Sequence, residues 1–399
     1  MKEMISSVTF LAGSLNEIEN TNTLNTTTVF DDTIVNFLHD LSISLLKDFR
    51  AKGHSDVITF AYWCRKGSIS TIKSRYSENL DRIGKGTSFH ITPSNVPVLF
   101  AFSLVLSLLA GNRSIVKISS KDFPQVKIIC DNINELLNQK YPTVKKMVFI
   151  VRYPHNQEIN EYFTSLCDVR IIWGGNNTIQ EIRNAKLRAD STEIPFYDRF
   201  SISLINSDEY NEVKDKKEFA RKFYNDTYFS DQNACTSPIL VIWVGKEKNK
   251  AKKDFWDSLN EYAETKYSLQ PIQGIDKYAM FCKLSIKYPS VRVLHKSNLL
   301  WRIQIDKLYD DLEEFKCPGG FFFEYEANNL DDINKILRKN CQTLSIYGLD
   351  SSLVKEHIIK FGLRGVDRIV PIGETMEFDV IWDGYDMITE LSRIIHLRL

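Results

Sequence analysis

Short apolar runs alternate with amphipathic segments along most of the chain, and this alternation predicts strands followed by helices. Helices are predicted over 98–109, where Gly111 and Asn112 mark the end, and from Pro124 to about 138. Apolar runs of strand length lie before, between and after them, at 89–92, 114–119, 147–153, 169–175 and 200–206. Strands that alternate with helices of this length indicate a mostly parallel sheet built from strand–helix–strand units.

A second region of the same kind begins near Ser207. Residues 218–235 predict a polar helix that runs into Cys235, and the charged stretch 246–254 predicts a solvated helix face or loop. Further apolar runs predict strands at 239–245, 319–327, 342–349 and 367–373, with a helix over 330–337. We therefore expect two domains, one of residues 1–206 joined by about 371–399 and one of residues 207–370.

The N-terminal part shows a different pattern. Residues 16–28 are rich in Asn and Thr and predict a loop. Asp31 and Asp32 then precede an apolar stripe at helical spacing, which predicts a helix that faces a core; the stripe consists of Ile34, Phe37, Leu38, Leu41 and Leu45.

Composition narrows the class of protein. A length of 399 residues fits two domains, and the 51 basic and 51 acidic residues give a net charge of zero, which argues against a nucleic-acid binder. The seven cysteines are odd in number and none has CxxC spacing, so we expect reduced thiols in a cytoplasm rather than disulfides or a metal site. No apolar stretch has the length of a membrane span, and the N-terminus lacks the apolar segment of a signal peptide.

Cys235 is the candidate nucleophile. It stands in the polar segment SDQNACTSP, between the predicted helix and a strand, where Pro238 ends the helix. A thiol at such a junction reaches a cleft more readily than a core, and a nucleophilic cysteine needs access. From this context alone, a buried and inert cysteine is the alternative.

Asn95 is the candidate oxyanion donor. Pro93 and Pro97 fix the backbone on both sides of it, at the end of a predicted strand. A carboxamide on a rigid turn can direct its N–H at charge that develops in a transition state. The alternative is an ordinary turn asparagine that bonds its own backbone.

Two strand ends suggest a nucleotide. Lys117, Ser119 and Ser120 follow one strand, where ligands of open α/β sheets bind, and no carboxylate stands there to repel a 2′-phosphate, which favours NADPH over NADH. Gly174 and Gly175, after Trp173, let the backbone approach a pyrophosphate or nicotinamide. A surface lysine with a capping serine and a common Gly-Gly turn are the alternatives, and the GxGxxG fingerprint is absent.

The order of these segments resembles the aldehyde dehydrogenase superfamily. Its branch of LuxC-type acyl-CoA reductases is the most similar, from about Thr87 to the C-terminus, in the segments FHITPSNVPVLFAFS, LLAGNRSIVKISSKDFPQ, IPFYDRFSISLI, DQNACTSP and DRIVPIGETMEFDVIWDGYDMI. The resemblance implies an α/β fold of two Rossmann-like parallel-sheet domains, one for the cofactor and one catalytic, with room for a small oligomerisation element.

The resemblance also implies roles for individual residues. Cys235 would be the nucleophile and Asn95 the oxyanion donor, helped by the Cys235 backbone N–H. Residues at three strand ends would bind the cofactor: Thr92, Pro93, Ser94, Lys117, Ser119, Ser120, Trp173, Gly174 and Gly175.

The chain departs from ordinary aldehyde dehydrogenases at two motifs. No glutamate matches their general base near IPFYDRF, since Glu193 lies too early. Reduction of an acyl-enzyme needs hydride and no water-activating base, so this absence fits a reductase. The ribose-binding motif is altered to EEFKCPGGF, which leaves Glu314 and Glu324 without assigned roles, and His90 is expected in a core or beside the site.

The resulting expectation is an NADPH-dependent enzyme that reduces an acyl thioester to an aldehyde. Its partners would be acyl-CoA or an acylated carrier or synthetase protein, and it would be a homo-oligomer that neither binds nucleic acid nor spans a membrane. A cysteine acyltransferase or thioesterase without a nicotinamide cofactor, and a scaffold subunit of an acyl-activating complex, remain alternatives.

Overall fold

The computed structural model describes residues 7–21, 25–76 and 81–398, which form two compact units. The first unit contains the chain up to Tyr197 together with the segment from Tyr385 onward, and the second is Asp198–Gly384. The predicted domain boundaries at 206 and about 371 both fall inside the second unit. The reason is that strands β8 (Phe200–Asn206) and β14 (Arg368–Pro371) belong to the second unit's sheet.

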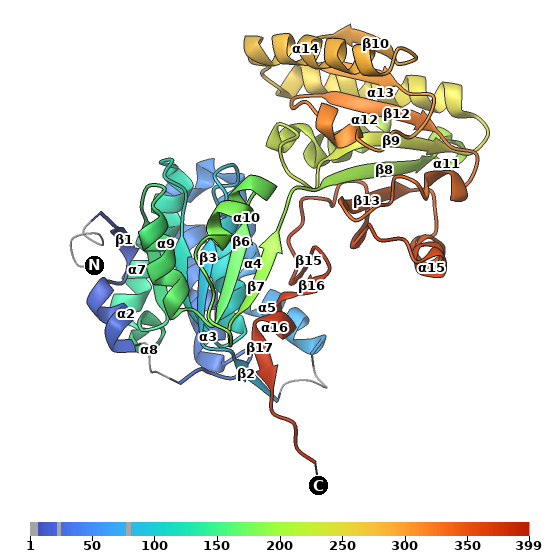
Figure 1. Cartoon of the computed structure of the whole chain (residues 1–399). Helices are drawn as coiled ribbons and strands as arrows, with labels where there is room; N and C mark the ends of the chain where they lie inside the picture. Colours follow the sequence, from blue (N-terminus) through green and yellow to red (C-terminus); the bar gives the residue numbers. More distant parts are fainter. Residues whose placement is uncertain (1–6, 22–24, 77–80, 399) are drawn as a thin grey trace. The chain divides into compact units, whose positions relative to one another are not determined.

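The first unit contains a six-stranded sheet in the order β1-β5-β4-β3-β6-β7 (Figure 1). All neighbouring strands are parallel except the edge strand β1, which runs antiparallel to β5. The chain moves outward from β3 in one direction through β4 and β5, and then in the other direction through β6 and β7. The point where the order reverses lies between β3 and β6, and ligands of open α/β sheets bind at the carboxyl ends beside such a point. The strands are β1 (Thr9–Ala12), β3 (Thr87–Ile91), β4 (Arg113–Lys117), β5 (Val148–Arg152), β6 (Val169–Trp173) and β7 (Thr192–Phe196).

Helices cover both faces of this sheet (Figure 1). Asp31 caps α3 by accepting hydrogen bonds from the backbone of Thr33 and Ile34, and the predicted stripe of this helix is buried. The loop predicted over 16–28 is wrong where α2 forms, and residues 22–24 lie outside the described part of the chain. The helices are α2 (Leu15–Thr21), α3 (Asp32–Lys47), α4 (Ser55–Trp63), α5 (Lys66–Ser74), α6 (Leu99–Leu109), α7 (Pro124–Gln139), α8 (Pro142–Lys145), α9 (Gln157–Leu166), α10 (Asn176–Arg183) and α16 (Met387–Glu390), with the 3-10 turn η1 (Phe49–Gly53) and the short strands β2 (Arg82–Gly84), β16 (Tyr385–Asp386) and β17 (Ser392–Ile394).

The second unit contains a seven-stranded sheet in the order β10-β11-β12-β9-β8-β13-β14. From β11 to β14 all neighbours are parallel, and β10 pairs with β11 as an antiparallel edge strand. The five strands β12-β9-β8-β13-β14 repeat the reversal seen in the first unit, so both domains have the predicted Rossmann-like topology. The further strands are β9 (Pro238–Val244), β10 (Arg292–Ser297), β11 (Leu300–Gln304), β12 (Phe321–Glu326), β13 (Cys341–Tyr347) and β15 (Ile381–Trp382).

Two predicted helices of this unit are shorter than their sequences suggest. The helix expected to run into Cys235 ends at Asp226, and the one expected over 330–337 is only the 3-10 turn η4 (Asp331–Ile333). The charged stretch 246–254 belongs largely to α13. The remaining elements are α11 (Ser207–Asn211), α12 (Lys216–Asp226), α13 (Lys248–Lys266), α14 (Pro271–Lys287) and α15 (Ser351–Phe361), with the 3-10 turns η2 (Tyr228–Ser230) and η3 (Leu312–Phe315).

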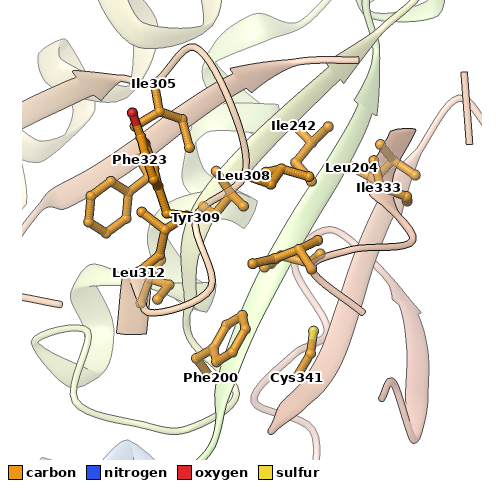
Figure 2. Close-up of a cluster of buried hydrophobic side chains, with 14 of the residues drawn as sticks. Phe200, Leu204, Ile242, Ile305, Leu308, Tyr309, Leu312, Phe323, Ile333 and Cys341 are labelled. Carbon is orange, nitrogen blue, oxygen red and sulfur yellow. The ribbon is translucent and has the colours of Figure 1, made fainter. Parts of the chain in front are cut away.

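Alternate residues of the second sheet pack into two different cores. Leu204 and Ile242 face a core that includes α14 and α15, whereas Ile205 and Trp243 face a core with α12 and α13. This period of two follows from the pleat of a strand, so a central strand with continuous apolar sequence buries both faces. Figure 2 shows the first of these cores, in which Phe200 and Cys341 are the first residues of β8 and β13.

Within the described residues, no helix combines the length and apolar character needed to cross a membrane.

Candidate active site

Cys235 lies in an irregular loop between η2 and β9, three residues before the strand begins. Its side chain is half-buried, and all seven cysteines are free thiols. The loop is reached through Asp231 and Gln232, two successive residues in the left-handed region with φ of 52° and 57°. Such conformations cost energy for residues other than glycine and persist where the surroundings hold them in place.

The side chain of Gln232 supplies that hold. It is buried, and its amide donates to the carbonyls of Pro238 and Phe321 at 3.0 and 3.1 Å. Its oxygen accepts from the backbone N–H groups of Gly320 and Phe321. Gln232 therefore fastens the loop to the start of β12. Within the polar segment around Cys235, Gln232 and Thr236 are buried, whereas Asn233, Ala234 and Cys235 keep exposure.

Cys235 stands at the amino edge of the second sheet. The starts of β8, β9, β13 and β14 meet at this edge, and the Ser201 hydroxyl of β8 donates to the Cys235 carbonyl at 2.7 Å. Ligands of open α/β sheets usually bind at the opposite, carboxyl edge. Cys235, the predicted nucleophile, is thus positioned by a loop and by strand starts, away from the point where the strand order reverses.

A polar network that sequence reasoning missed faces Cys235. Gln342 of β13 donates through Nε2 to the Cys235 sulfur at 3.4 Å and also to the carboxylate of Asp383. Arg199 lies 3.8 Å from Asp383 and forms an ion pair with Asp367. These residues are far from Cys235 in the chain, and Gln342 begins an apolar strand, so no local motif marks them.

Burial determines the ionisation of this thiol. It raises the pKa of Cys235 to about 11, and the nearby Asp383 carboxylate acts in the same direction. The Gln342 amide and the Arg199 guanidinium act in the opposite direction because they stabilise the thiolate. Burial also raises the pKa of Asp383 above its ordinary range.

The first unit gathers the predicted cofactor residues at one edge. Thr92, Pro93 and Ser94 follow β3, Lys117 ends β4, and Trp173 ends β6, and these three strands are neighbours in the sheet. Because the strands are parallel, their carboxyl ends lie at the same edge, beside the point where the order reverses. Ser119 and Ser120 follow β4 there, and Gly174 and Gly175 follow β6.

Lys117 is the cation of this edge. Its ammonium lies 4.9 Å from the ring centre of Tyr153, and burial lowers the pKa of Lys117. Within the described residues no carboxylate forms an ion pair with it. The carboxylate nearest in sequence, Asp122, instead pairs with Arg152 at 3.2 Å. A part-buried cation of this kind is suited to an anionic ligand.

The neighbouring hydroxyls have local backbone partners. Thr92 is buried and donates to the Lys117 carbonyl at 2.9 Å, which ties the ends of β3 and β4 together. Ser119 accepts from the backbone N–H of Lys121, and exposed Ser120 approaches the Tyr153 carbonyl at 3.5 Å. Ser119 and Ser120 therefore remain within reach of a ligand, whereas Thr92 has a structural position.

Trp173 and His90 form a buried group below this edge. The Trp173 ring stacks on Phe196 with centroids 3.6 Å apart, and its indole N–H donates to Ser103 at 3.0 Å. His90 bridges the hydroxyls of Ser103 and Ser88, and burial lowers the pKa of His90 to about 3. His90 is thus a neutral core histidine, and Trp173 orients the turn that follows it without exposing its ring.

Gly175 is the residue before helix α10, and it makes no side-chain cap of this helix. Backbone N–H groups at a helix start favour a negatively charged group. A Cβ at Gly174 would lie 3.1 Å from Thr178, so even the smallest side chain there would need Thr178 to move.

Asn95 is exposed on the turn between β3 and α6. Within the described residues its carboxamide has no hydrogen-bond partner, so it does not bond its own backbone as an ordinary turn asparagine would. Asn95 and the cofactor residues belong to the first unit and Cys235 to the second, and each set is described within its own unit.

Neither glutamate of the altered ribose motif is a clear ligand. Glu324 is buried and accepts hydrogen bonds from the indoles of Trp243 and Trp256 and from Arg302, so its oxygens are occupied within the core. Glu314 is exposed at the end of η3.

A cavity of the first unit lies elsewhere. It has a volume of about 570 Å³ and lies in the first unit at the amino edge of β3 and β4, where Lys85, Arg113 and Asp168 line it. None of the predicted site residues lines this cavity.

Comparison with known proteins gives a consistent result. A family model described as acyl-CoA reductase (LuxC) matches residues 17–394, which extends the similarity upstream of Thr87. Long-chain acyl-protein thioester reductases of Vibrio harveyi and Aliivibrio fischeri are 24% and 25% identical over 319 residues. The match covers 78% of this chain and 63% of each relative, so the chain spans less than two thirds of their length.

Solved structures share the fold. A benzaldehyde dehydrogenase from Corynebacterium glutamicum has a TM-score of 0.62 and 12% identity, covering 96% of this chain and 90% of that one. Lactaldehyde dehydrogenase from Escherichia coli has a TM-score of 0.63 and 11% identity, with coverage of 95% and 87%. A glyceraldehyde-3-phosphate dehydrogenase from Methanocaldococcus jannaschii, complexed with NADP, has a TM-score of 0.61 and 12% identity, with coverage of 98% and 92%. The chain therefore has the fold of the aldehyde dehydrogenases, as predicted.

Proposed function

Because the chain belongs to the acyl-CoA reductase (LuxC) family, we propose that it reduces an acyl thioester to an aldehyde through a covalent intermediate on Cys235. The observation that carries this proposal is the setting of the thiol. Cys235 is half-buried on a constrained loop, and an amide donor and a guanidinium lie beside it that favour its thiolate. A thiol that merely fills a core lacks such a setting.

The first step transfers the acyl group. The Cys235 thiolate attacks the thioester carbonyl carbon, and a tetrahedral oxyanion forms that the Asn95 carboxamide and the Cys235 backbone N–H stabilise by donating hydrogen bonds. The bond to the donor sulfur then breaks, and the released thiolate takes up the proton that Cys235 lost. The product is an acyl-cysteine.

The second step releases the aldehyde. A bound nicotinamide cofactor would supply the hydride that reduces the acyl-cysteine carbonyl. The thiohemiacetal that forms on Cys235 collapses, its C–S bond breaks, and the aldehyde leaves with the thiolate regenerated. Asn95 stabilises the oxyanion of this step as well.

The cofactor we propose is NADPH, held by the carboxyl edge of the first sheet. Lys117, Ser119 and Ser120 would bind the adenosine end with its 2′-phosphate. This role is supported by the part-buried charge of Lys117, which has no ion-pair partner in the described part of the chain. Gly174, Gly175 and the start of α10 would lie toward the nicotinamide. Pro93 and Ser94 would contact the cofactor at the end of β3, with Thr92 and Trp173 supporting this edge.

The proposed acyl donor is a long-chain acyl group on CoA or on a partner protein, in keeping with the names of the curated relatives. We also propose a homo-oligomer, by analogy with the usual assemblies of the superfamily. A cytoplasmic location is proposed because all seven cysteines are free.

The test is NADPH consumption at 340 nm with the full chain and a panel of acyl-CoAs of increasing length. Wild-type protein should oxidise NADPH and form aldehyde, Cys235→Ala should do neither, and Asn95→Ala should be slower by about 100- to 1000-fold. Release of free acid without NADPH use would instead support the thioesterase alternative.

A further inference from the structure

The carboxamide of Gln342 occupies a buried position that a hydrophobic residue would ordinarily fill. Gln342 is fully buried at the start of β13, among the apolar residues of that strand. An amide in such a place costs free energy unless its hydrogen bonds are made. Its Nε2 group makes two, to the Cys235 sulfur at 3.4 Å and to the Asp383 carboxylate. Its Oε1 has no partner among the described residues.

This pattern defines which way the amide points. An NH₂ group has two hydrogens, so it can serve the sulfur and the carboxylate at once. The reverse orientation would place Oε1 against the Asp383 carboxylate and against a thiolate, which is repulsive. The Asp383 carboxylate therefore selects the orientation in which the donor faces Cys235.

Asp383 is itself held in place. It has a left-handed backbone conformation with φ of 50°, and its side chain is only 4% exposed. Arg199 lies 3.8 Å from it and also donates to the Cys341 carbonyl at 2.8 Å, next to Gln342 in β13. A strained, buried carboxylate that surrounding residues fix in this way is typical of functional sites.

We propose that Gln342 is a further catalytic residue, which donates a hydrogen bond to the Cys235 sulfur, and that Asp383 is a positioning residue that orients this amide and opposes thiolate formation. The proposal rests on the proposed role of Cys235 as nucleophile. It adds two residues, more than 100 positions away from Cys235 in the chain, that control when the thiol ionises.

The charges around Cys235 determine the expected directions. Asp383 is the carboxylate that disfavours the thiolate, while Arg199 and Arg368 are the cations beside it, and Asp367 pairs with Arg199. Removing the Asp383 charge therefore favours the thiolate, and removing the Gln342 donor disfavours it. These opposite signs distinguish control of ionisation from a loss of packing, because loosening the loop would make Cys235 more accessible in both variants.

The experiment is the rate of Cys235 alkylation by iodoacetamide at pH 7–9 in the full chain, read by peptide mass spectrometry. It compares Asp383→Asn, Gln342→Leu and the control Asn233→Ala, an exposed residue of the same loop. When the pKa of a thiol falls by one unit, its thiolate fraction rises about tenfold while the nucleophilicity of the thiolate falls. The alkylation rate therefore rises by only about threefold. We expect Asp383→Asn to react at least about threefold faster and Gln342→Leu at least about threefold slower than wild type, with Asn233→Ala unchanged.

Faster reaction of both variants, or no change in either, would overturn the proposal. If Gln342→Leu does not fold, Gln342→Glu keeps the volume, removes the donor and should also react more slowly. Alkylation requires no turnover, so the two proposals can fail separately. Opposite changes in alkylation rate without reductase activity would support the roles of Gln342 and Asp383 alone. Cys235-dependent turnover without any change in alkylation rate would reject these two roles.

Discussion

At the scale of the residue, the proposed chemistry depends on how much Cys235 is ionised. Because burial raises the pKa of this thiol to about 11, only a small fraction of it is a thiolate at pH 7. In the proposed reaction, groups that change this fraction also change the acylation rate. The proposed effect of Gln342 and Asp383 on the fraction acts through the contact of Gln342 with Cys235 and that of Asp383 with Gln342.

Cys235 and Asn95 are candidates from sequence because each stands in a short segment with its own chemical pattern, and their roles stay predictions. Gln342 and Asp383 could not be predicted, because the fold alone brings them to Cys235: Gln342 is 107 positions away and begins an apolar strand. Glu324, which the altered ribose motif leaves without an assigned role, has its oxygens occupied by two indoles and an arginine, and only the fold shows this.

His90 yields a prediction about pH and stability. Its pKa is about 3 in the folded protein against 6.5 when unfolded, so the unfolded state binds one more proton between these values. Stability is therefore retained above pH 6.5 and lost as pH falls toward 3, by up to about 1.4 kcal/mol per pH unit. Urea unfolding at pH 7 and pH 5 should show this loss in wild type, and the loss between these two pH values should be smaller by about 2 kcal/mol in His90→Gln. Equal losses in both proteins would contradict a neutral, buried His90.

At the scale of the element, the loop that carries Cys235 is the decisive segment. The sequence predicts a helix that continues to Cys235, because residues 218–235 contain no proline or glycine. The structure ends α12 at Asp226, where the buried carboxylate accepts from the backbone of Gly373 and Thr375. A long-range contact thus overrides local helix preference.

The apolar strands were predicted well because their local pattern agrees with their place in the fold. Runs such as 239–245 are apolar on both faces, as expected of a central strand of a parallel sheet, which buries both faces. Helix α14 was missed since several large apolar residues, including Ile272 and Ile275, are exposed and blur its pattern.

The loop gives a second prediction. Gln232→Ala removes four buried hydrogen bonds that tie the loop to Pro238 and to the start of β12. Each unsatisfied buried group costs about 1–3 kcal/mol, so we expect at least about 2 kcal/mol of lost stability in urea unfolding and slower acylation of Cys235. The exposed neighbour variant Asn233→Ala should stay within about 0.5 kcal/mol of wild type. Similar effects of the two changes would argue against this anchoring role.

At the scale of the whole molecule, two units repeat one strand order but use opposite edges of their sheets. The first gathers its candidate cofactor residues at the carboxyl edge, and the second has Cys235 at the amino edge. The sequence predicted two Rossmann-like domains, but it placed the first boundary at 206 and the second at about 371, whereas the second unit is Asp198–Gly384. Strand β8 follows the last strand of the first unit directly, and only its pairing with β9 and β13 assigns it to the second.

The most direct test of acyl-cysteine reduction is the intact mass of the full chain, measured after incubation with a long-chain acyl thioester and again after NADPH is added. The donors are acyl-CoA and an acylated carrier protein. Wild type should gain one acyl group, Cys235→Ala should gain none, and NADPH should remove the group as an equal amount of aldehyde. Acylation that persists in Cys235→Ala, or discharge as free acid without NADPH, would contradict the proposed function.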